Sequence, residues 1–302
     1  MQPSINMISK YLKSEFGSKT VKLSLDGGFT CPNRDGSKGS GGCIFCSADG
    51  SGDFASTIEE QIRLLSRKWP NARYLAYFQN HTNTYAPVEI LRQKFYAALN
   101  HPLISGIAIA TRPDCLNEEI LELLSEINEK HFLWVELGLQ TIHETTAELI
   151  NRCYHLPVYD EAMTQLKKRN IRTVVHLILG LPGETKEDMT ESVRYVCDSG
   201  AWGIKLHMLN VVRGSQMETL MPDYCSFESI EEYVNLVCDL IEIIPPEIVI
   251  HRLSADAPRK ILMTPPWSYQ KRTILNGIHA ELAKRGSTQG CKLKTPVDSS
   301  AV

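Results

Sequence analysis

TVVHLILGLPGETKEDMTESVRYVCD (residues 173–198) contains one complete strand–turn–helix unit, and this unit is the pattern on which the fold is built. Its first seven residues are β-branched or apolar apart from one histidine, as expected of a parallel strand that is buried on both faces. The PGET turn that follows is a good helix start. The remaining residues read as a helix, so the stretch predicts one β/α unit.

The same alternation is repeated along the first two thirds of the chain. Further apolar runs of strand length lie near residues 21–25, 74–78, 106–111, 132–137 and 202–208. Segments with helical spacing of apolar residues lie between them. Strands that alternate with helices form right-handed βαβ units and a parallel sheet. We therefore expect an α/β fold, a partial (β/α)6 TIM-like barrel of parallel strands, with an open doubly wound sheet as the alternative.

The alternation of strands and helices stops near residue 212, which suggests a second unit. We expect a core domain over residues 1–212 and a C-terminal extension, residues 213–302, that packs on the barrel. Within the extension, the sequence predicts a helix near 228–243, a short strand at 248–251 and a helix near 269–285.

The composition agrees with a globular protein. With 302 residues, 43% of them hydrophobic and 22% charged, the chain can bury a large core. It has no run of about 18 apolar residues and its start lacks the layout of a signal peptide, so we expect a cytoplasmic protein with no membrane partner. Grouped cysteines in a reducing compartment are typical of metal-binding or catalytic sites. The net charge of −3 gives no overall attraction to nucleic acid, although 67–73 and 166–172 are candidate basic faces.

Three cysteines lie in a glycine-rich loop, residues 26–50, directly after the first predicted strand. Their spacing is Cys31-x11-Cys43-x2-Cys46. Three thiolates can ligate an iron–sulfur cluster or zinc, yet a structural zinc and a [4Fe–4S] cluster each normally take four protein ligands. Three ligands on a [4Fe–4S] cluster would leave one iron open to a small molecule. A zinc-stabilised or unliganded loop is the alternative. Barrels carry their active sites on loops at this end of the strands.

Other stretches in the same order along the chain make the family resemblance specific. They are 31–46, 77–87, 110–116, 135–152, 176–185, 202–208, 251–258 and 265–271. On these motifs the sequence resembles radical S-adenosylmethionine (SAM) enzymes, and more narrowly the YhcC-type proteins, which are relatives of the elongator catalytic subunit. The gap between Cys31 and Cys43 is longer than in the common C-x3-C-x2-C motif of the superfamily and is typical of this subfamily.

The resemblance implies the cofactors and the reaction. Cys31, Cys43 and Cys46 would ligate three irons of a [4Fe–4S] cluster, and SAM would chelate the fourth. Reduction by a flavodoxin or ferredoxin would then split SAM and release a 5′-deoxyadenosyl radical. The implied substrate is the side chain of a tRNA wobble uridine, with conversion of carboxymethylaminomethyl to aminomethyl as one form of the reaction. A small metabolite or a protein side chain is the alternative substrate, and a non-catalytic iron–sulfur or zinc redox sensor is the alternative class.

Four residues at strand ends are expected at SAM by this resemblance. Gln79 and Asn80 follow the second strand, where the family faces the methionine part of SAM, although its glycine- and glutamate-containing motif is absent here. Glu136 and Gln140 lie at the end of the fourth strand, where a carboxylate could bind the ribose hydroxyls or the ammonium of SAM. Helix capping is the alternative role for the polar loop after the second strand.

Four further residues are expected to bind SAM. Arg152 matches an arginine that grips the SAM carboxylate, a role that suits a bidentate guanidinium. The family usually has asparagine-arginine-glycine-histidine here, whereas this chain has NRCYH, so a surface ion pair is the alternative. Ile178, Gly180 and Leu181 lie in the stretch that resembles the adenine-binding strand. A plain strand-to-helix turn is compatible with the same residues.

The candidate catalytic residues are Lys205, His207 and Asp114. Lys205 and His207 are two positions apart on the sixth strand and therefore point to one side of it, into the barrel. Other polar residues expected at the same mouth are Arg112, Arg252 and Asp256. Buried ion pairs that fasten the extension to the barrel are the alternative role for this group.

Overall fold

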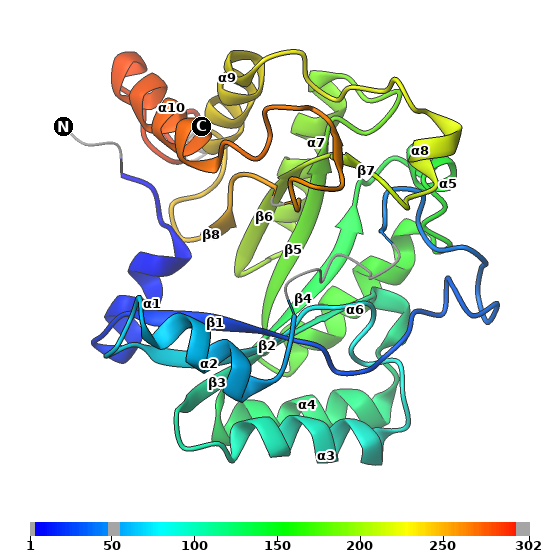
Figure 1. Cartoon of the computed structure of the whole chain (residues 1–302), viewed down its shortest axis with the longest axis vertical. Helices are drawn as coiled ribbons and strands as arrows, with labels where there is room; N and C mark the ends of the chain where they lie inside the picture. Colours follow the sequence, from blue (N-terminus) through cyan, green and yellow to red (C-terminus); the bar gives the residue numbers. More distant parts are fainter. Residues whose placement is uncertain (1–3, 48–54, 256, 294–302) are drawn as a thin grey trace, which may run out of the picture.

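The computed structural model describes residues 4–47, 55–255 and 257–293 and shows a curved parallel sheet with helices on its outer side (Figure 1). The sheet has seven strands in the order β1-β2-β3-β4-β5-β6-β8. The strands are β1 (Thr20–Leu25), β2 (Arg73–Phe78), β3 (Ile104–Thr111), β4 (Phe132–Gln140), β5 (Arg172–Leu179), β6 (Gly203–Met208) and β8 (Val249–Arg252). The predicted α/β partial barrel is confirmed, with one strand more than expected.

The described residues form helices before, between and after the strands, and those between β1 and β6 connect successive strands as the predicted β/α units require. They are α1 (Ile8–Phe16), α2 (Ile58–Ser66), α3 (Val88–Leu99), α4 (Glu118–Lys130), α5 (Glu144–Leu149), α6 (Leu156–Lys168), α7 (Lys186–Asp198), α8 (Met217–Leu220), α9 (Ile230–Ile241) and α10 (Lys271–Arg285), with a 3-10 turn at Pro113–Cys115. In the described residues, no helix is long and apolar enough to cross a membrane.

The unit at 173–198 folds as β5 followed by α7, and its turn explains where the helix begins. The hydroxyl of Thr185 accepts a hydrogen bond from the backbone N–H of Asp188, whose carboxylate accepts one from the N–H of Thr185 in return. This capping box satisfies two backbone donors that the helix cannot satisfy itself, and a cap of this type contributes about 1 kcal/mol. The helix therefore begins at Lys186, after a six-residue turn that follows Leu179 at the end of the strand.

The interior of the barrel is closed at the N-terminal ends of the strands by α1. Leu12 of this helix is buried among Leu75, Ala108 and Trp134, which are side chains on the inner face of the sheet. Tyr11 adds an edge-to-face contact with the ring of Trp202 at 5.1 Å. One end of the barrel is thereby filled with apolar side chains of the described residues.

The seventh strand comes from the predicted extension. β8 pairs in parallel with β6, with Gly203 opposite Val249, so the sheet runs across residue 212. A small antiparallel sheet of β7 (Val211–Val212) and β9 (Leu262–Thr264) joins the same two parts of the chain. α9 and α10 lie side by side at the top of the view (Figure 1). The extension thus completes the barrel as well as packing on it.

The two ends of the described chain meet at β8. The backbone N–H of Ile250 donates to the carbonyl of Asn6 at 2.8 Å, and the N–H of Asn6 donates to the side-chain oxygen of Gln289 at 2.8 Å. Gln289 also donates from its backbone to the carbonyl of Ser4 at 3.2 Å. Segments from both ends therefore hold the last strand of the sheet in place.

Candidate functional site

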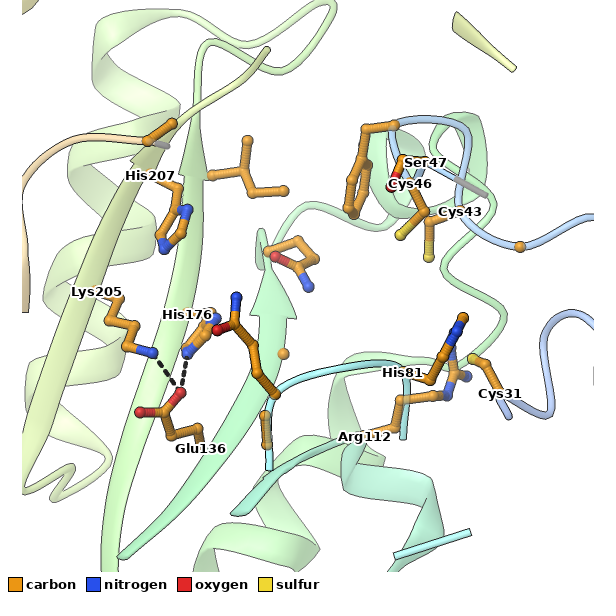
Figure 2. A pocket seen from close by; sticks show the side chains of 18 of the residues that line it. Cys31, Cys43, Cys46, Ser47, His81, Arg112, Glu136, His176, Lys205 and His207 are labelled. Carbon is orange, nitrogen blue, oxygen red and sulfur yellow. Dashed lines mark hydrogen bonds and ion pairs between the residues drawn. The ribbon is translucent and has the colours of Figure 1, made fainter. Parts of the chain in front are cut away.

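A cavity of about 380 Å³ opens at the C-terminal ends of the strands and reaches into the barrel. Figure 2 shows the three cysteines of the loop on one side of it and Glu136, His176, Lys205 and His207 on another. Other lining residues are Ser24, Arg34, Gln79, His81, Arg112, Gly138, Gln140, Arg152, Ile178 and Arg252. The volume falls within the range of about 300–1,000 Å³ that is usual for small-molecule sites.

The three predicted metal ligands converge on this cavity from one loop. Cys31, Cys43 and Cys46 all line it, and the backbone N–H of Cys46 donates to the carbonyl of Cys43 at 3.0 Å. A hydrogen bond from Cys43 lowers the pKa of the Cys46 thiol, and the positive charge of Arg34 adds to this effect. Residues 48–50 of the predicted loop lie outside the described residues. The hydrogen bond to Cys46 and burial raise the pKa of the Cys43 thiol. The three cysteines therefore line one cavity, none of them is fully buried, and a positive charge lies near Cys46, as expected of metal-binding cysteines.

An asparagine after α5 fastens the cysteine loop. The amide of Asn151 donates to the carbonyl of Gly42 at 2.8 Å and to that of Ser40 at 3.2 Å. Asn33 in the loop donates back to the carbonyl of Asn151 at 2.5 Å and lies 3.5 Å from the sulfur of Cys43. These side chains orient the loop without lying on its cavity side, so they act as positioning residues.

Asp114 takes part in a second anchor of the loop. Its carboxylate forms a bidentate pair with Arg112, at 2.9 and 3.0 Å, and an ion pair with Lys38 of the loop at 3.1 Å. The carboxylate is 4% exposed and does not line the cavity. Arg112 does line the cavity and donates to the carbonyl of Arg152 at 2.9 Å. The geometry thus gives Asp114 a positioning role and places it away from a substrate in the cavity.

Arg152 lines the cavity, but most of its donors are used by the protein. Its guanidinium donates to the carbonyls of Leu139 at 3.2 Å, Thr141 at 2.6 Å and Tyr154 at 3.0 Å, and lies 3.4 Å from the carboxylate of Glu144. The side chain is only 1% exposed. Arg152 therefore holds the segment that follows β4, and a bidentate grip on the SAM carboxylate would require part of this arrangement to change.

The polar residues expected at SAM after β2 and β4 divide into two groups. Gln79 and Gln140 line the cavity, and the hydroxyl of Ser24 donates to the side-chain oxygen of Gln79 at 3.1 Å. Gln140 has a φ of 72°, at an irregularity where β4 pairs with β5. Asn80 is buried and does not line the cavity. The structure therefore leaves Gln79 and Gln140 as candidates for contact with SAM.

The expected adenine-binding residues divide in the same way. Ile178 lines the cavity, whereas Gly180 and Leu181 do not. Gly180 has a φ of 77°, and a side chain there would lie 2.7 Å from Ser226. Leu181 is fully buried in an apolar cluster with Ile44 of the cysteine loop. The glycine is required by close packing against the extension, and the leucine supports the loop.

Glu136 is the centre of a buried network at the floor of the cavity. Its Oε2 accepts hydrogen bonds from the hydroxyl of Tyr77 at 2.6 Å, from Nε2 of His176 at 2.9 Å and from the ammonium of Lys205. Its Oε1 accepts one from the indole of Trp134 at 2.9 Å. These four donors come from β2, β4, β5 and β6, and dashed lines in Figure 2 mark two of the contacts. A carboxylate so fully paired within the protein is fixed in position.

The charges of this network keep the carboxylate ionised. Burial alone would raise the pKa of Glu136, but Lys205, Lys22 and His176 reverse this effect and hold it well below its ordinary value. Lys22 lies 4.0 Å from the carboxylate. Burial, reinforced by the charge of Lys205, lowers the pKa of His176 to about 4. Burial lowers the pKa of Lys205 well below its ordinary value, and the charge of Glu136 acts against this. The floor therefore holds one carboxylate, paired with Lys205, beside a neutral imidazole.

His207 lies next to this network and faces the cavity, as the i, i+2 pattern with Lys205 predicts. Its ring stacks on that of His176, with centroids 5.5 Å apart and planes 17° from parallel. Burial, reinforced by Arg252 and His176, holds the pKa of His207 well below its usual range. Nε2 of His207 has no hydrogen-bond partner among the residues that the structure describes. This neutral imidazole can donate or accept one hydrogen bond in the cavity. Asp256, expected nearby, lies outside the described residues.

Three members of the network, Lys22, Trp134 and His176, are not singled out by the sequence patterns. Each lies on the inner face of its strand and contacts Glu136. The usable signal is an imidazole or ammonium group within an otherwise apolar strand, as in TVVHLIL, because such a group needs a partner inside the barrel. The signal indicates burial beside a charge without showing which charge.

With this geometry established, comparison with known proteins identifies the family. Residues 33–196 match the model of the radical SAM superfamily, and residues 201–284 match that of the radical SAM C-terminal domain. The chain belongs to the radical SAM superfamily. The family predicted from the motifs is thereby confirmed.

The radical SAM relatives include proteins that match almost the whole chain. YtqA of Bacillus subtilis is 46% identical over 292 residues, which cover 94% of this chain and 91% of the relative. YhcC of Escherichia coli strain K12 is 36% identical over 305 residues, which cover 98% and 97%. The structure of an archaeal Elp3 from Methanocaldococcus infernus has a TM-score of 0.67 at 16% identity and covers 89% of this chain and 64% of that one. The last comparison shows a shared fold alone.

Radical SAM proteins bind a [4Fe–4S] cluster and SAM, and the donor set of the cavity fits both. Of the cysteines in the described residues, only Cys31, Cys43 and Cys46 line the cavity. Three thiols match a cluster that keeps one iron open for SAM, whereas a structural zinc would take a fourth protein ligand. The unpartnered Nε2 of His207 and the side chain of Gln79 offer polar contacts to molecules held between the cluster and the floor.

Proposed function

We propose that this radical SAM enzyme modifies the side chain of a tRNA wobble uridine. The observation that carries the proposal is the cavity itself, in which three thiols with no fourth cysteine in the described lining face a floor of fixed charged and imidazole groups. This arrangement can hold the cofactors at the mouth and a reacting group beneath them. When bound, the reduced cluster and SAM supply a 5′-deoxyadenosyl radical.

The side chains of this protein contribute position and charge. The buried network of Glu136 fixes Lys205 and the ring of His176, and the apolar contacts of α1 close the far end of the barrel. A reacting group in the cavity would therefore be closed off from water on the side of α1, where competing reactions with water are reduced. His207 is the residue of this floor with an unused ring nitrogen among the described residues, so we propose it as a contact to the substrate.

Two features support a 5-substituted uridine as the substrate. The resemblance to the elongator catalytic subunit implies carbon-centred chemistry on the wobble base. Among the lining residues, Glu136 is the single carboxylate, whereas Arg34, Arg112 and Arg252 are cationic, and this excess of positive charge favours a negatively charged substituent. Conversion of carboxymethylaminomethyl to aminomethyl would place such a carboxylate in the cavity.

Radical chemistry is tested by anaerobic reconstitution of the cluster, followed by incubation with SAM and dithionite. We expect methionine and 5′-deoxyadenosine, and we expect Cys43→Ala to abolish both. The matched control is Cys291→Ala, which removes an exposed cysteine outside the cavity lining. A chain that binds metal but never cleaves SAM would instead be a non-catalytic iron–sulfur or zinc protein.

The substrate is tested by mass spectrometry of tRNA nucleosides from a strain in which the gene is deleted. We expect the wobble uridine to accumulate in its precursor form and to be restored by the intact gene, but not by one that carries Cys43→Ala. An unchanged wobble uridine profile, together with normal SAM cleavage in vitro, would exclude tRNA and direct the search to a small metabolite or a protein side chain.

A further inference from the structure

The segment between β8 and α10 forms part of the rim of the cavity. Ala257 and Pro258 line the cavity, and the next two residues, Arg259 and Lys260, are exposed. Residues 257–272 read APRKILMTPPWSYQKR, with four cationic residues and no acidic one. In a chain whose net charge is −3, this is a local concentration of positive charge beside the entrance.

The backbone of this rim segment, residues 257–272, is held by several contacts. β9 within it pairs with β7, and the N–H of Arg213 donates to the carbonyl of Ile261 at 2.8 Å. The indole of Trp267 donates to the carbonyl of Glu228 at 3.3 Å. Arg213 itself is exposed and directly follows Val212, which lines the cavity. The cations are therefore carried on a fixed platform on one side of the entrance.

An aromatic ring is presented on the same platform. The guanidinium of Arg259 lies over the ring of Tyr269, 4.4 Å from its centroid, and Tyr269 is still 41% exposed. A ring and a guanidinium plane are both surfaces on which an unpaired base can stack. An acidic peptide would be attracted by the charge alone, whereas the combination of cations with an exposed ring matches a nucleic acid strand.

The two basic faces suggested by the sequence lie at the end of the barrel opposite the entrance of the cavity. Residues 67–73 lead into the start of β2, and residues 166–172 lead into the start of β5. All strands of the main sheet are parallel, so both faces lie at the N-terminal ends of the strands. The cavity opens at the opposite ends, so neither of these faces borders its entrance.

We propose that the rim segment, together with Arg213, is the surface on which an RNA strand rests while one of its bases enters the cavity. Arg213, Arg259 and Lys260 contact phosphates, and Tyr269 stacks with a base that flanks the inserted one. This inference rests on the proposed RNA substrate and adds the part of the protein that binds it.

The first test measures binding of a fluorescently labelled tRNA transcript to the reconstituted protein with SAM present. We expect the Arg259→Glu/Lys260→Glu variant to raise Kd at least about tenfold near 0.1 M salt. The slope of log Kd against log salt concentration should decrease by the amount that corresponds to about one to two phosphate contacts. The matched control is Lys10→Glu/Lys13→Glu, which makes the same charge change on exposed residues of α1 at the closed end of the barrel. We expect this control to bind within about twofold of the wild type, as for distant surface charges.

The second test separates stacking from charge. Tyr269→Ala should weaken binding about tenfold, because stacking of one base on an aromatic ring contributes that order of affinity, whereas Tyr269→Phe should bind as the wild type does. SAM cleavage without RNA should be unchanged in every rim variant, which shows that the fold and the cofactor site are intact.

The outcomes distinguish this inference from the proposed function. If the wild type binds tRNA and the rim variants bind equally well, the surface is assigned wrongly while the RNA substrate stands. If the wild type cleaves SAM but does not bind tRNA, the RNA substrate and the surface are both refuted. Displacement of tRNA by polyglutamate at equal charge concentration would show a surface for acidic proteins and would also overturn the inference.

Discussion

Replacing Glu136 with glutamine is the sharpest test of the buried network. In the wild type, one carboxylate accepts hydrogen bonds from Tyr77, His176, Lys205 and Trp134, and the side chain of Lys205 is only 1% exposed. The neutral amide leaves this ammonium buried without its counter-ion. Removal of one partner from a buried ion pair costs about 3–5 kcal/mol.

The cost can be converted to a shift in melting temperature. An unfolding entropy of about 2.1 cal/mol/K per residue gives about 0.63 kcal/mol/K for 302 residues, so we expect Glu136→Gln to lower Tm by roughly 5–8 °C. Anaerobic scanning calorimetry of the reconstituted wild type and variant measures this shift. The control is Glu118→Gln, which removes a carboxylate that is 66% exposed from its ion pair with Arg169 and should change Tm by no more than about 2 °C.

A double variant tests the assigned cause. Glu136→Gln combined with Lys205→Met removes both charges, so we expect it to regain at least half of the lost Tm, because no unpaired ammonium remains. A single variant that melts within 2 °C of the wild type would refute the buried ion pair. A double variant that melts far below Glu136→Gln would show that packing of the lysine side chain matters more than its charge.

Three other predictions follow from the site. Because burial and Lys205 lower the pKa of His176 to about 4, the unfolded chain binds a proton between about pH 6.5 and 4 that the native chain does not. The free energy of unfolding should therefore decrease toward acid over this range by up to about 1.4 kcal/mol per pH unit. Urea titrations at several pH values measure this slope, and equal slopes for the wild type and His176→Asn would contradict the prediction. Asn151→Ala should accelerate loss of cluster iron to a chelator about 10- to 100-fold, and an unchanged rate would remove its positioning role. Gly39→Ala should reduce the iron bound per chain, since its Cβ would lie 2.1 Å from Asn33, and full iron occupancy would show that the loop can adjust.

Much of the fold is predictable because its pattern is local. Each parallel strand is a short apolar run, and each helix has its own apolar spacing and often its own cap, as Thr185 provides for α7. The pairing of β8 with β6 is not local, so a four-residue apolar run could be predicted as a strand without its partner being known. The packing of α1 against the sheet could not be predicted either, because the sequence of a nine-residue amphipathic helix does not show which surface the helix covers.

The site was predictable where spacing alone decides the geometry. Three cysteines in one loop must lie near each other, and Lys205 and His207 must share a side of one strand. Sequence cannot show whether a polar side chain is paired with protein or with a ligand. Arg152 is expected at SAM from the resemblance and Asp114 at the mouth of the barrel, yet the structure pairs them with backbone carbonyls and with charged side chains. Their role is set by neighbours that are distant in sequence.

The late position of β8 in the chain has a consequence for biosynthesis. The cysteine loop is translated long before the strand that ends at Arg252, and at about 5–20 residues per second roughly 10–40 s separate the two on the ribosome. During this interval the emerging chain carries three thiols beside a half-built barrel that α1 and the C-terminal segment have not yet sealed. Iron delivered to the nascent chain before β8 is made would meet an incomplete pocket, so we expect insertion of the cofactor to follow synthesis of this strand.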